Sequence, residues 1–300
     1  MQYFLLSLYF RYLHSQDSDD TNNFQFEKEV SDYKKNNAVL KAVSIVYIGV
    51  VVVCGIVKMK KKTKNIIAIV LTLIIGMGAF FYIYVSDYYR ADISAEEALK
   101  YHDDGVEIKY EENTIWFVPE NIKAGFVFYP GGKVEYSAYA PLLRECAKQG
   151  ILSAVTRMPF NLAVFNPDAA EGLTSKYPDV DRWYIGGHSL GGAMAADYAS
   201  KHDEEFKGLI LLASYSTKDL RNKELMVLSI YGSNDEVLNI ESYADNLINL
   251  PLDTTEIILE GGCHSQFGSY GLQKGDGVCA ISSDEQLKLT VKAISEFTDD

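Results

Sequence analysis

The stretch 184–199, YIGGHSLGGAMAADYA, constrains the possible folds of this chain more than any other segment. A short apolar run leads into it and an alanine-rich helical pattern leaves it, yet four glycines stand within seven residues at the junction. Because glycine weakens both strands and helices, these glycines indicate a tight turn in which side chains would collide. Residues 187–191, GHSLG, fit G-x-S-x-G, the pattern of a nucleophilic serine on a strand–turn–helix elbow.

A plain alternative exists for Ser189. A glycine-rich turn between a strand and a helix can also carry a serine that only caps the helix. The context favours catalysis, because the elbow exposes the Ser189 hydroxyl and a helix beginning at Leu190 directs its free N–H groups at the reaction centre. Ser189 is therefore the candidate nucleophile.

A serine hydroxyl needs a base, which in elbow enzymes follows in the chain order serine, carboxylate, histidine. His264 comes directly after the apolar run TTEIILEGG. The other histidine downstream of Ser189 is His202, in the polar sequence KHDEE, where we expect it to be solvated. His264 is therefore predicted to be the base.

The carboxylate that orients the base has three candidates. Asp235 lies just after the apolar run LMVLSIYG, in the turn GSND, and its rivals are Glu236 and Asp219. Asp235 is preferred because a residue at a strand end, in a turn of this kind, can present its carboxylate to an imidazole.

Two backbone N–H groups are needed to stabilise the tetrahedral oxyanion. The residue after the nucleophile, Leu190, supplies one of them. The other is expected from the loop PGGK after the apolar run AGFVFY, where Gly132 allows a close approach of the backbone to a substrate.

Beyond Gly105 the pattern alternates between strands and helices. VEIKY and TIWFV read as a hairpin, and six further apolar runs are separated by helical patterns such as YSAYAPLLRECAKQG and DEQLKLTVKAISEF. This alternation predicts an α/β fold with a mostly parallel sheet and helices on both faces. In such sheets the functional residues lie at the carboxyl ends of the strands.

These residues resemble the α/β-hydrolase superfamily, and within it the compact branch of dienelactone-hydrolase-like proteins. The matching blocks are YPGGKVEYSAYAPL, RWYIGGHSLGGAMAADYA, SIYGSNDEVL and GGCHSQFGSYGLQKGDG, and the resemblance covers about residues 105–297. It implies the α/β-hydrolase fold, a triad of Ser189, Asp235 and His264, and an oxyanion hole from Leu190 and Gly132.

Some details depart from relatives in this superfamily. Pro130 stands where lipases often have a histidine before the oxyanion glycine, and dienelactone hydrolases proper use a cysteine nucleophile. These differences bear on the substrate more than on the type of reaction. His188, beside the serine, is interpreted as packing under the elbow. Asp276, in the polar segment after His264, is assigned no role, because a solvated loop explains it equally well.

Two apolar runs precede the catalytic domain. Residues 39–57 and 66–85 are long enough to cross a bilayer, and the basic loop 58–64, KMKKKTK, between them is expected to face the cytoplasm. We predict a two-helix transmembrane hairpin that is bound to the lipid bilayer through residues 39–85, with the catalytic domain outside the cytoplasm. Residues 1–38 form a polar or interfacial segment, 86–104 a linker and 105–300 the hydrolase domain.

Charge and composition exclude several function classes. Residues 1–85 carry a net charge of about +4 and residues 86–300 about −17, so the larger region repels nucleic acid. The chain lacks a phosphate-binding G-x-x-x-x-G-K-[ST] loop and zinc-ligand spacing, and the proposed chemistry needs no cofactor and no metal. Cys263 and Cys279 can form a disulfide in an oxidising compartment, but spacing alone leaves this pairing open.

The sequence therefore favours a membrane-anchored serine hydrolase that cleaves a small-molecule ester, thioester or lactone through an acyl-enzyme on Ser189. Two alternatives remain. A hydrolase fold can serve as a non-catalytic binding or scaffold module, although a decayed site usually loses a member of its triad. The same triad can also transfer the acyl group to an acceptor other than water.

Overall fold

The computed structural model describes residues 61–100 and 104–299. The chain divides into two compact units at the boundary between Ala79 and Phe80. The predicted segment 1–38 and the first predicted span, 39–57, lie outside the described residues. The second predicted span, 66–85, lies within the helix α3 (Lys61–Ser86). Among the described residues α3 alone is long and apolar enough to cross a membrane, with a mean hydropathy of 2.6.

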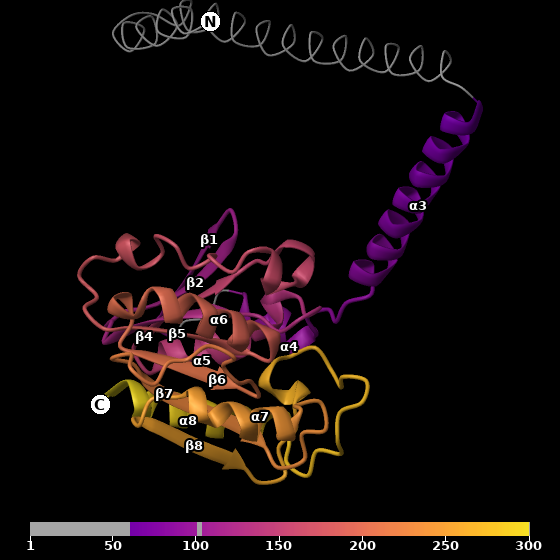
Figure 1. Ribbon diagram of the computed structural model, residues 1–300. Helices are drawn as coiled ribbons and strands as arrows, with labels where there is room; N and C mark the ends of the chain where they lie inside the picture. Colours follow the sequence, from indigo (N-terminus) through magenta and orange to yellow (C-terminus); the bar gives the residue numbers. More distant parts are fainter. Residues whose placement is uncertain (1–60, 101–103, 300) are drawn as a thin grey trace, which may run out of the picture. The chain divides into compact units, whose positions relative to one another are not determined.

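The larger unit is built on one sheet of eight strands (Figure 1). The strands are β1 (Val106–Glu111), β2 (Thr114–Pro119), β3 (Ala124–Tyr129), β4 (Ile151–Thr156), β5 (Trp183–His188), β6 (Gly208–Leu212), β7 (Met226–Gly232) and β8 (Thr254–Leu259). Their order in the sheet is β1-β2-β4-β3-β5-β6-β7-β8. The pairs β1–β2 and β2–β4 are antiparallel, and all the following pairs are parallel. The predicted α/β fold with a mostly parallel sheet is confirmed.

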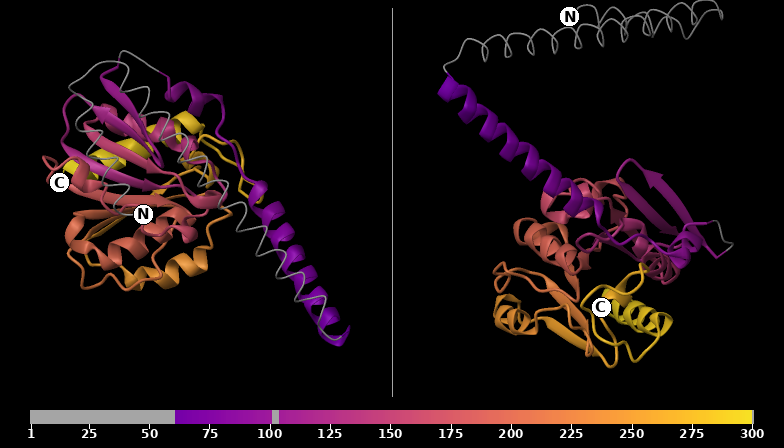
Figure 2. Two further views of the ribbon diagram at one scale, coloured as in Figure 1. Left: turned by 90° about the horizontal axis from the view of Figure 1, so that it is seen from above. Right: turned by 90° about the vertical axis from the view of Figure 1, so that its right-hand side faces the viewer.

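Helices cover both faces of this sheet, as its buried apolar strands require. Two of them, α5 (Ala140–Lys148) and α8 (Ser283–Asp299), share one core with strand residues of one face. The small side chains of α6 (Leu190–Lys201) allow it to lie close against the other face. On that face α7 (Ile240–Asn246) is tied to β7 by a hydrogen bond of 2.9 Å between Tyr243 Oη and Ser229 Oγ. Figure 2 separates α8, in yellow, from α6 and α7 in its right-hand view.

Residues 86–100, which belong to the segment 86–104 that the sequence predicts to be a linker, are packed against the domain. They contain the helix α4 (Ile93–Ala98), which Asp92 caps by accepting hydrogen bonds from Ser94 N and Ala95 N. Tyr89 forms a parallel β-bridge with Val134, in the loop after β3. This segment is therefore part of the folded unit that carries the site.

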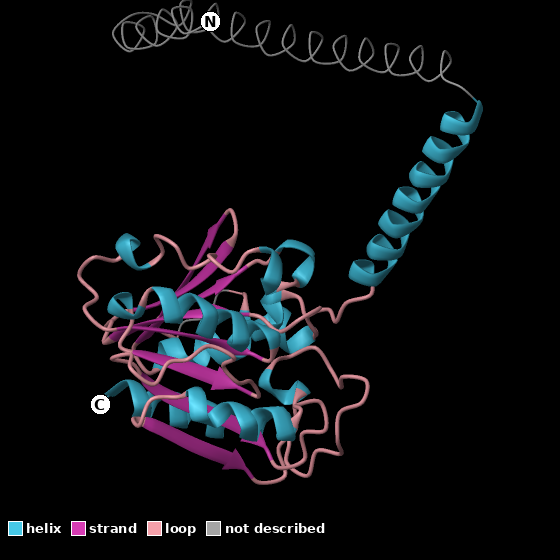
Figure 3. Ribbon diagram, in the orientation of Figure 1, coloured by secondary structure: helices cyan, strands magenta, loops and turns pink. Residues whose placement is uncertain are grey.

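The topology gathers the candidate residues on one side of the domain. Parallel strands end at the same edge of a sheet, and in Figure 3 the arrowheads of β7 and β8 point toward the side where long loops gather. Gly132 follows β3, Ser189 follows β5, Asp235 follows β7 and His264 follows β8. All four loops leave the carboxyl edge.

Candidate active site

Ser189 occupies a strained turn between β5 and α6. Its φ of 52° and ψ of −124° lie in a region that side chains disfavour. Two hydrogen bonds hold this backbone: Ser189 N donates to Leu212 O over 2.9 Å, and Ser214 Oγ donates to Ser189 O over 2.7 Å. Ser189 remains half-buried, so its side chain is accessible. This is the geometry of a nucleophile elbow.

The glycines on either side of the serine are explained by close backbone approach. A Cβ atom on Gly187 would lie 2.5 Å from the carbonyl oxygen of Tyr129, and one on Gly191 would lie 2.2 Å from the same atom. Both separations are shorter than any real contact, so only glycine fits at either position. The elbow thus needs glycine because β3 ends directly beneath it.

His264 and Asp235 are joined at the carboxyl edge. His264 Nδ1 lies 2.8 Å from Asp235 Oδ2, and both side chains are 1% exposed. The other oxygen, Oδ1, accepts hydrogen bonds from the backbone N–H groups of Val237 and Leu238, at 2.9 and 2.7 Å. Asp235 is thereby fixed as an acceptor for an Nδ1–H donor, which leaves His264 Nε2 with a lone pair.

Nothing in the described part of the chain hydrogen-bonds to His264 Nε2, although this atom is buried. The ring of His264 lies 4.5 Å, between centroids, from that of His188, the residue before the serine. The base and the nucleophile therefore lie on the same edge of the sheet. No hydrogen bond joins Ser189 Oγ to the imidazole among the described residues; in free enzymes this contact is often long and tightens when substrate binds.

The two predicted oxyanion donors lie side by side. A Cβ atom on Gly132 would lie 3.0 Å from Cδ2 of Leu190, so the loop after β3 meets the first turn of α6. The preceding residue, Gly131, donates its N–H to Tyr139 Oη over 3.0 Å, and the same hydroxyl lies 2.8 Å from His188 Nδ1. One buried tyrosine therefore connects the oxyanion loop to the elbow.

His188 is kept neutral by its surroundings. It is 1% exposed, and burial, followed by the charge of His264, holds its pKa well below the usual value. Burial also raises the pKa of Tyr139, so its hydroxyl keeps a proton that can be donated to His188 Nδ1. His188 is packed beneath the elbow, as predicted. The sequence did not indicate its hydrogen-bond partner, the hydroxyl of Tyr139.

The sequence profile described as "Alpha/beta hydrolase family" matches residues 125–288, which is more than half of the chain. The protein belongs to the alpha/beta hydrolase family. The match begins in β3 and ends in α8, so it contains the elbow and all three predicted triad residues.

Two solved structures similar to this alpha/beta hydrolase have low sequence identity. A predicted CIB-like hydrolase from Thermoplasma acidophilum is 15% identical, with a TM-score of 0.48, over 64% of this chain and 100% of that chain. TT1662 from Thermus thermophilus is 12% identical, with a TM-score of 0.49, over 65% of this chain and 99% of that chain. No curated protein matches the sequence significantly.

The loop that carries His264 in this alpha/beta hydrolase has two attachments. Cys263 and Cys279 form a disulfide, which closes a loop that contains His264. Within that loop Asp276 Oδ1 accepts from His264 N at 3.1 Å, and Asp276 Oδ2 accepts from Ser265 N at 2.8 Å. Asp276, to which the sequence assigned no role, is thus a direct partner of the histidine loop.

The rival residues lie elsewhere. Asp219 is exposed and paired with Arg221 at 2.6 Å, and Glu236 is exposed. His202 is exposed and stacks on Tyr198, with ring centroids 4.2 Å apart. None of the three contacts His264 through a described hydrogen bond.

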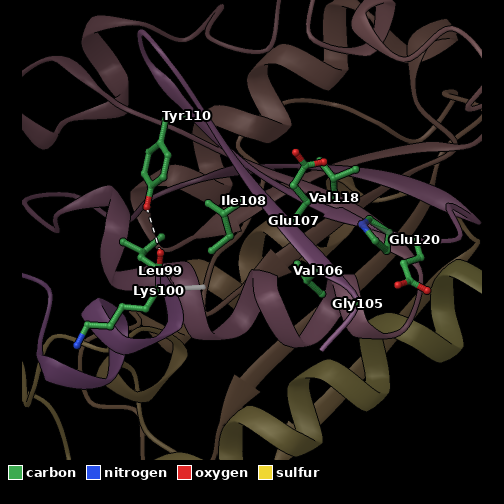
Figure 4. Close-up of a pocket in the computed structure, with 10 residues that line it drawn as sticks. Leu99, Lys100, Gly105, Val106, Glu107, Ile108, Tyr110, Val118 and Glu120 are labelled. Carbon is green, nitrogen blue, oxygen red and sulfur yellow. Dashed lines mark hydrogen bonds between the residues drawn. The ribbon is translucent and has the colours of Figure 1, made fainter. Parts of the chain in front are cut away.

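A cavity of about 500 Å³ lies along β1 and β2, away from these residues (Figure 4). Its lining includes Tyr110, whose hydroxyl donates to Leu99 O over 3.3 Å, together with Val106 and Ile108. None of the predicted site residues is in this lining. Across the described ranges 61–100 and 104–299, no group of three His, Cys, Asp or Glu side chains is arranged to hold a metal ion.

Proposed function

We propose that this alpha/beta hydrolase is a membrane-anchored serine hydrolase that cleaves a carboxylic ester, thioester or lactone. The observation that carries the proposal is the buried Asp235–His264 hydrogen bond beside the strained turn of Ser189. A carboxylate that fixes the Nδ1–H tautomer leaves Nε2 free to take a proton from a serine hydroxyl. The family gives the fold and supports hydrolysis; the choice of substrate bond is the proposal.

The reaction follows from these positions. Ser189 Oγ attacks the carbonyl carbon of the substrate while His264 Nε2 takes the hydroxyl proton. The oxyanion that forms accepts hydrogen bonds from Leu190 N–H and Gly132 N–H. The intermediate then collapses, the carbon–heteroatom bond breaks, and His264 returns the proton to the leaving group, which departs from the acyl-enzyme.

Deacylation repeats the same steps with water. His264 takes a proton from a water molecule, whose oxygen attacks the acyl carbon on Ser189, and the imidazole then returns the proton to Ser189 Oγ as the acid is released. Asp235 keeps the imidazole in one tautomer throughout. His264 therefore accepts one proton and returns it in each half of the cycle.

Membrane anchoring and an extracytoplasmic catalytic domain belong to the same proposal. The apolar helix α3 supports an anchor, because the apolar side chains along its length are exposed. The Cys263–Cys279 disulfide fits an oxidising compartment, where such bonds persist. The lysines of the segment 58–64, which includes the first turn of α3, fit a cytoplasmic start of the span.

A fluorophosphonate probe tests the proposed chemistry on the full-length protein in membranes. We expect covalent labelling of the wild type and none of Ser189→Ala. Asp235→Asn should retain the fold and be labelled about 10³–10⁴-fold more slowly, because the imidazole loses its tautomer control. Asp219→Asn, which alters the exposed rival, is the matched control and should be labelled at the rate of the wild type. A folded wild type that is not labelled would instead favour the binding or scaffold module.

A further inference from the structure

The loop that holds the oxyanion glycine is fastened to the residues that follow the apolar helix. Tyr89 N donates to Lys133 O over 2.7 Å, three residues beyond the end of α3. The ammonium of Lys133 pairs with Asp87 at 3.1 Å and lies 4.7 Å from the ring centroid of Tyr84, in the last turn of α3. Because Lys133 directly follows Gly132, the oxyanion loop stands next to the point where the apolar helix ends.

Three aromatic rings cluster at this point. Phe81 lies 5.2 Å from Phe160 and 5.8 Å from Phe165, and the last two are 5.5 Å apart, all measured between ring centroids. The rings pack edge to face but are not covered: Phe81 is 37% exposed, Phe160 52% and Phe165 49%. We name these three residues the aromatic cluster. Exposed aromatic rings at the end of an apolar helix are typical of the boundary between membrane and water.

The loop that carries the aromatic cluster reaches the oxyanion hole. Asn161 O accepts a hydrogen bond from Lys133 N over 2.7 Å. Leu162 Cδ2 lies 3.8 Å from the position of a Cβ atom on Gly132, which also neighbours Leu190. The apolar side chain of Leu162 therefore borders Gly132, one of the two predicted oxyanion donors, and Phe160 and Phe165 of the aromatic cluster lie in the same loop.

The same loop is strained in a way that exposes an aromatic ring. Phe160 and Asn161 have φ values of 57° and 56°, which cost side-chain-bearing residues free energy. The turn holds Phe160 where its ring packs edge to face on Phe81 and Phe165 while more than half of the residue stays exposed. Strained backbone of this kind is concentrated at functional sites.

A cavity of about 760 Å³ lies between this loop and the end of α3, within the size range of ligand sites. Its lining combines three apolar side chains, Val85, Met158 and Phe160, with more numerous polar ones, among them Glu135 and Arg157, and it includes none of the predicted site residues. Arg157 is exposed and makes no described hydrogen bond or ion pair through its side chain. A mixed lining of this kind offers contacts to both parts of an amphiphile, its apolar chain and its polar head.

We infer that the substrate is a long-chain acyl ester carried in the bilayer, and that its acyl chain passes from the membrane along the aromatic cluster and Leu162 to Ser189. This inference rests on the proposed serine hydrolase and names its class of substrate. The acyl carbonyl reaches the oxyanion hole while the chain stays in contact with apolar surface, so the substrate need not enter water.

The test compares two esters with the same leaving group on the full chain reconstituted in phosphatidylcholine vesicles. One is p-nitrophenyl butyrate, which is soluble, and the other is p-nitrophenyl palmitate, which partitions into the vesicles. The measured quantity is the ratio of kcat/KM for palmitate to that for butyrate. This ratio does not depend on how much of a variant is folded, because both substrates are cleaved by the same population of active enzyme.

The variant Phe160→Ser/Phe165→Ser should lower this ratio at least about tenfold, because two apolar contacts with the acyl chain are lost. Leu252→Ser is the matched control, since Leu252 is an exposed apolar residue that lies in the loop before β8. The control should leave the ratio at the value of the wild type.

The outcomes distinguish failure of the inferred long-chain substrate from failure of the proposed serine hydrolase activity. An unchanged ratio in the double variant would overturn the inference, as would a wild type that cleaves butyrate but not vesicle-bound palmitate; in both cases the serine hydrolase would stand. Failure to cleave either ester, together with no fluorophosphonate labelling, would remove the proposed function itself.

Discussion

Asp276 accepts a hydrogen bond from the backbone N–H of His264, with 3.1 Å between nitrogen and Oδ1. Its other oxygen accepts from the backbone N–H and the hydroxyl of Ser265, at 2.8 and 2.6 Å. A charged acceptor of several donors fixes a loop more firmly than neutral hydrogen bonds do. Asp276 is therefore placed to position the backbone of the proposed base, without touching its imidazole.

Replacing Asp276 by asparagine should slow catalysis more than it weakens substrate binding. The amide keeps one acceptor, so His264 is displaced by a fraction of an ångström to about an ångström, and kcat should fall about 10- to 100-fold with little change in KM. The rate constant of fluorophosphonate labelling should fall in proportion, while the final labelled fraction stays complete.

A lower rate constant with a complete labelled fraction indicates that Asp276 positions His264. Loss of fold would instead reduce the labelled fraction and leave the rate constant of the remaining folded enzyme unchanged. Asp284→Asn is the control, because Asp284 is exposed in the first turn of α8. A normal labelling rate in Asp276→Asn would show that the disulfide and packing alone hold His264.

The Cys263–Cys279 disulfide closes the loop that contains both His264 and Asp276. Reduction should lower the free energy of unfolding by about 3 kcal/mol, since a cross-link over a loop of this size restricts the unfolded chain. For a domain of this size the unfolding midpoint should drop by about 6–12 °C, measured by differential scanning calorimetry with and without reductant.

The double variant Cys263→Ser/Cys279→Ser provides the internal control. It should melt at the temperature of the reduced wild type and respond to reductant no further, because the remaining described cysteine, Cys146, is buried and unpaired. If reductant lowered the midpoint of this variant as well, the effect would have another origin.

Tyr139 joins the oxyanion loop to the elbow, so its hydroxyl should contribute to stability and to rate. Tyr139→Phe leaves the N–H of Gly131 and Nδ1 of His188 buried without their partner, which should cost about 1–3 kcal/mol of unfolding free energy. A less firmly held oxyanion loop should also lower kcat by about tenfold or more.

Urea unfolding and steady-state kinetics measure these two effects separately. Tyr177→Phe is a suitable comparison, because Tyr177 is half-buried and packs its ring on Trp116 without a described hydrogen bond from its hydroxyl. Equal losses in both variants would assign the effect to packing of the ring edge, and the link between Tyr139 and the oxyanion loop would be rejected.

The strands and the elbow could be predicted because their signals are local. Short apolar or alternating runs indicated every strand of the sheet, and the glycines around Ser189 indicated a turn, whose crowding is due to the backbone of Tyr129. Asp235 and His264 were found by their position after strands, since the ends of parallel strands meet whatever the intervening sequence. Their catalytic roles, and that of Ser189, stay predictions.

Contacts over long sequence separations left no such signal. Asp276 lies in a glycine-rich segment without periodicity, and Tyr139 looks in the sequence like one more apolar residue at the start of a helix. The sequence predicts residues 86–104 to be a linker, whereas the main chain of Tyr89 in this segment bonds to Lys133 in the oxyanion loop. Backbone partners of this kind depend on the assembled fold.

A partly buried ion pair outside the site gives the domain a pH-dependent stability. Arg144, in α5, donates to both oxygens of Asp104, at 2.8 and 2.6 Å, and the side chains are 4% and 21% exposed. These hydrogen bonds lower the pKa of Asp104 from 3.8 to about 2. The same guanidinium donates to Ala98 O, at the end of α4, and thereby ties α4 to α5.

Because the pKa of Asp104 is lower in the folded chain than in the unfolded one, the pair stabilises the fold above about pH 4, and this stabilisation is lost as the pH falls toward about 2. Asp104→Asn should therefore lower the unfolding free energy by about 1–2 kcal/mol at about pH 6, a value reduced for the partial exposure of the carboxylate. The difference from the wild type should shrink at about pH 2, where about half of the native Asp104 carboxyl is itself protonated. Urea unfolding at both pH values measures this, with Asp219→Asn as a control in an exposed pair; a deficit that stayed constant across the range would mean that Asp104 acts through hydrogen bonding in either charge state.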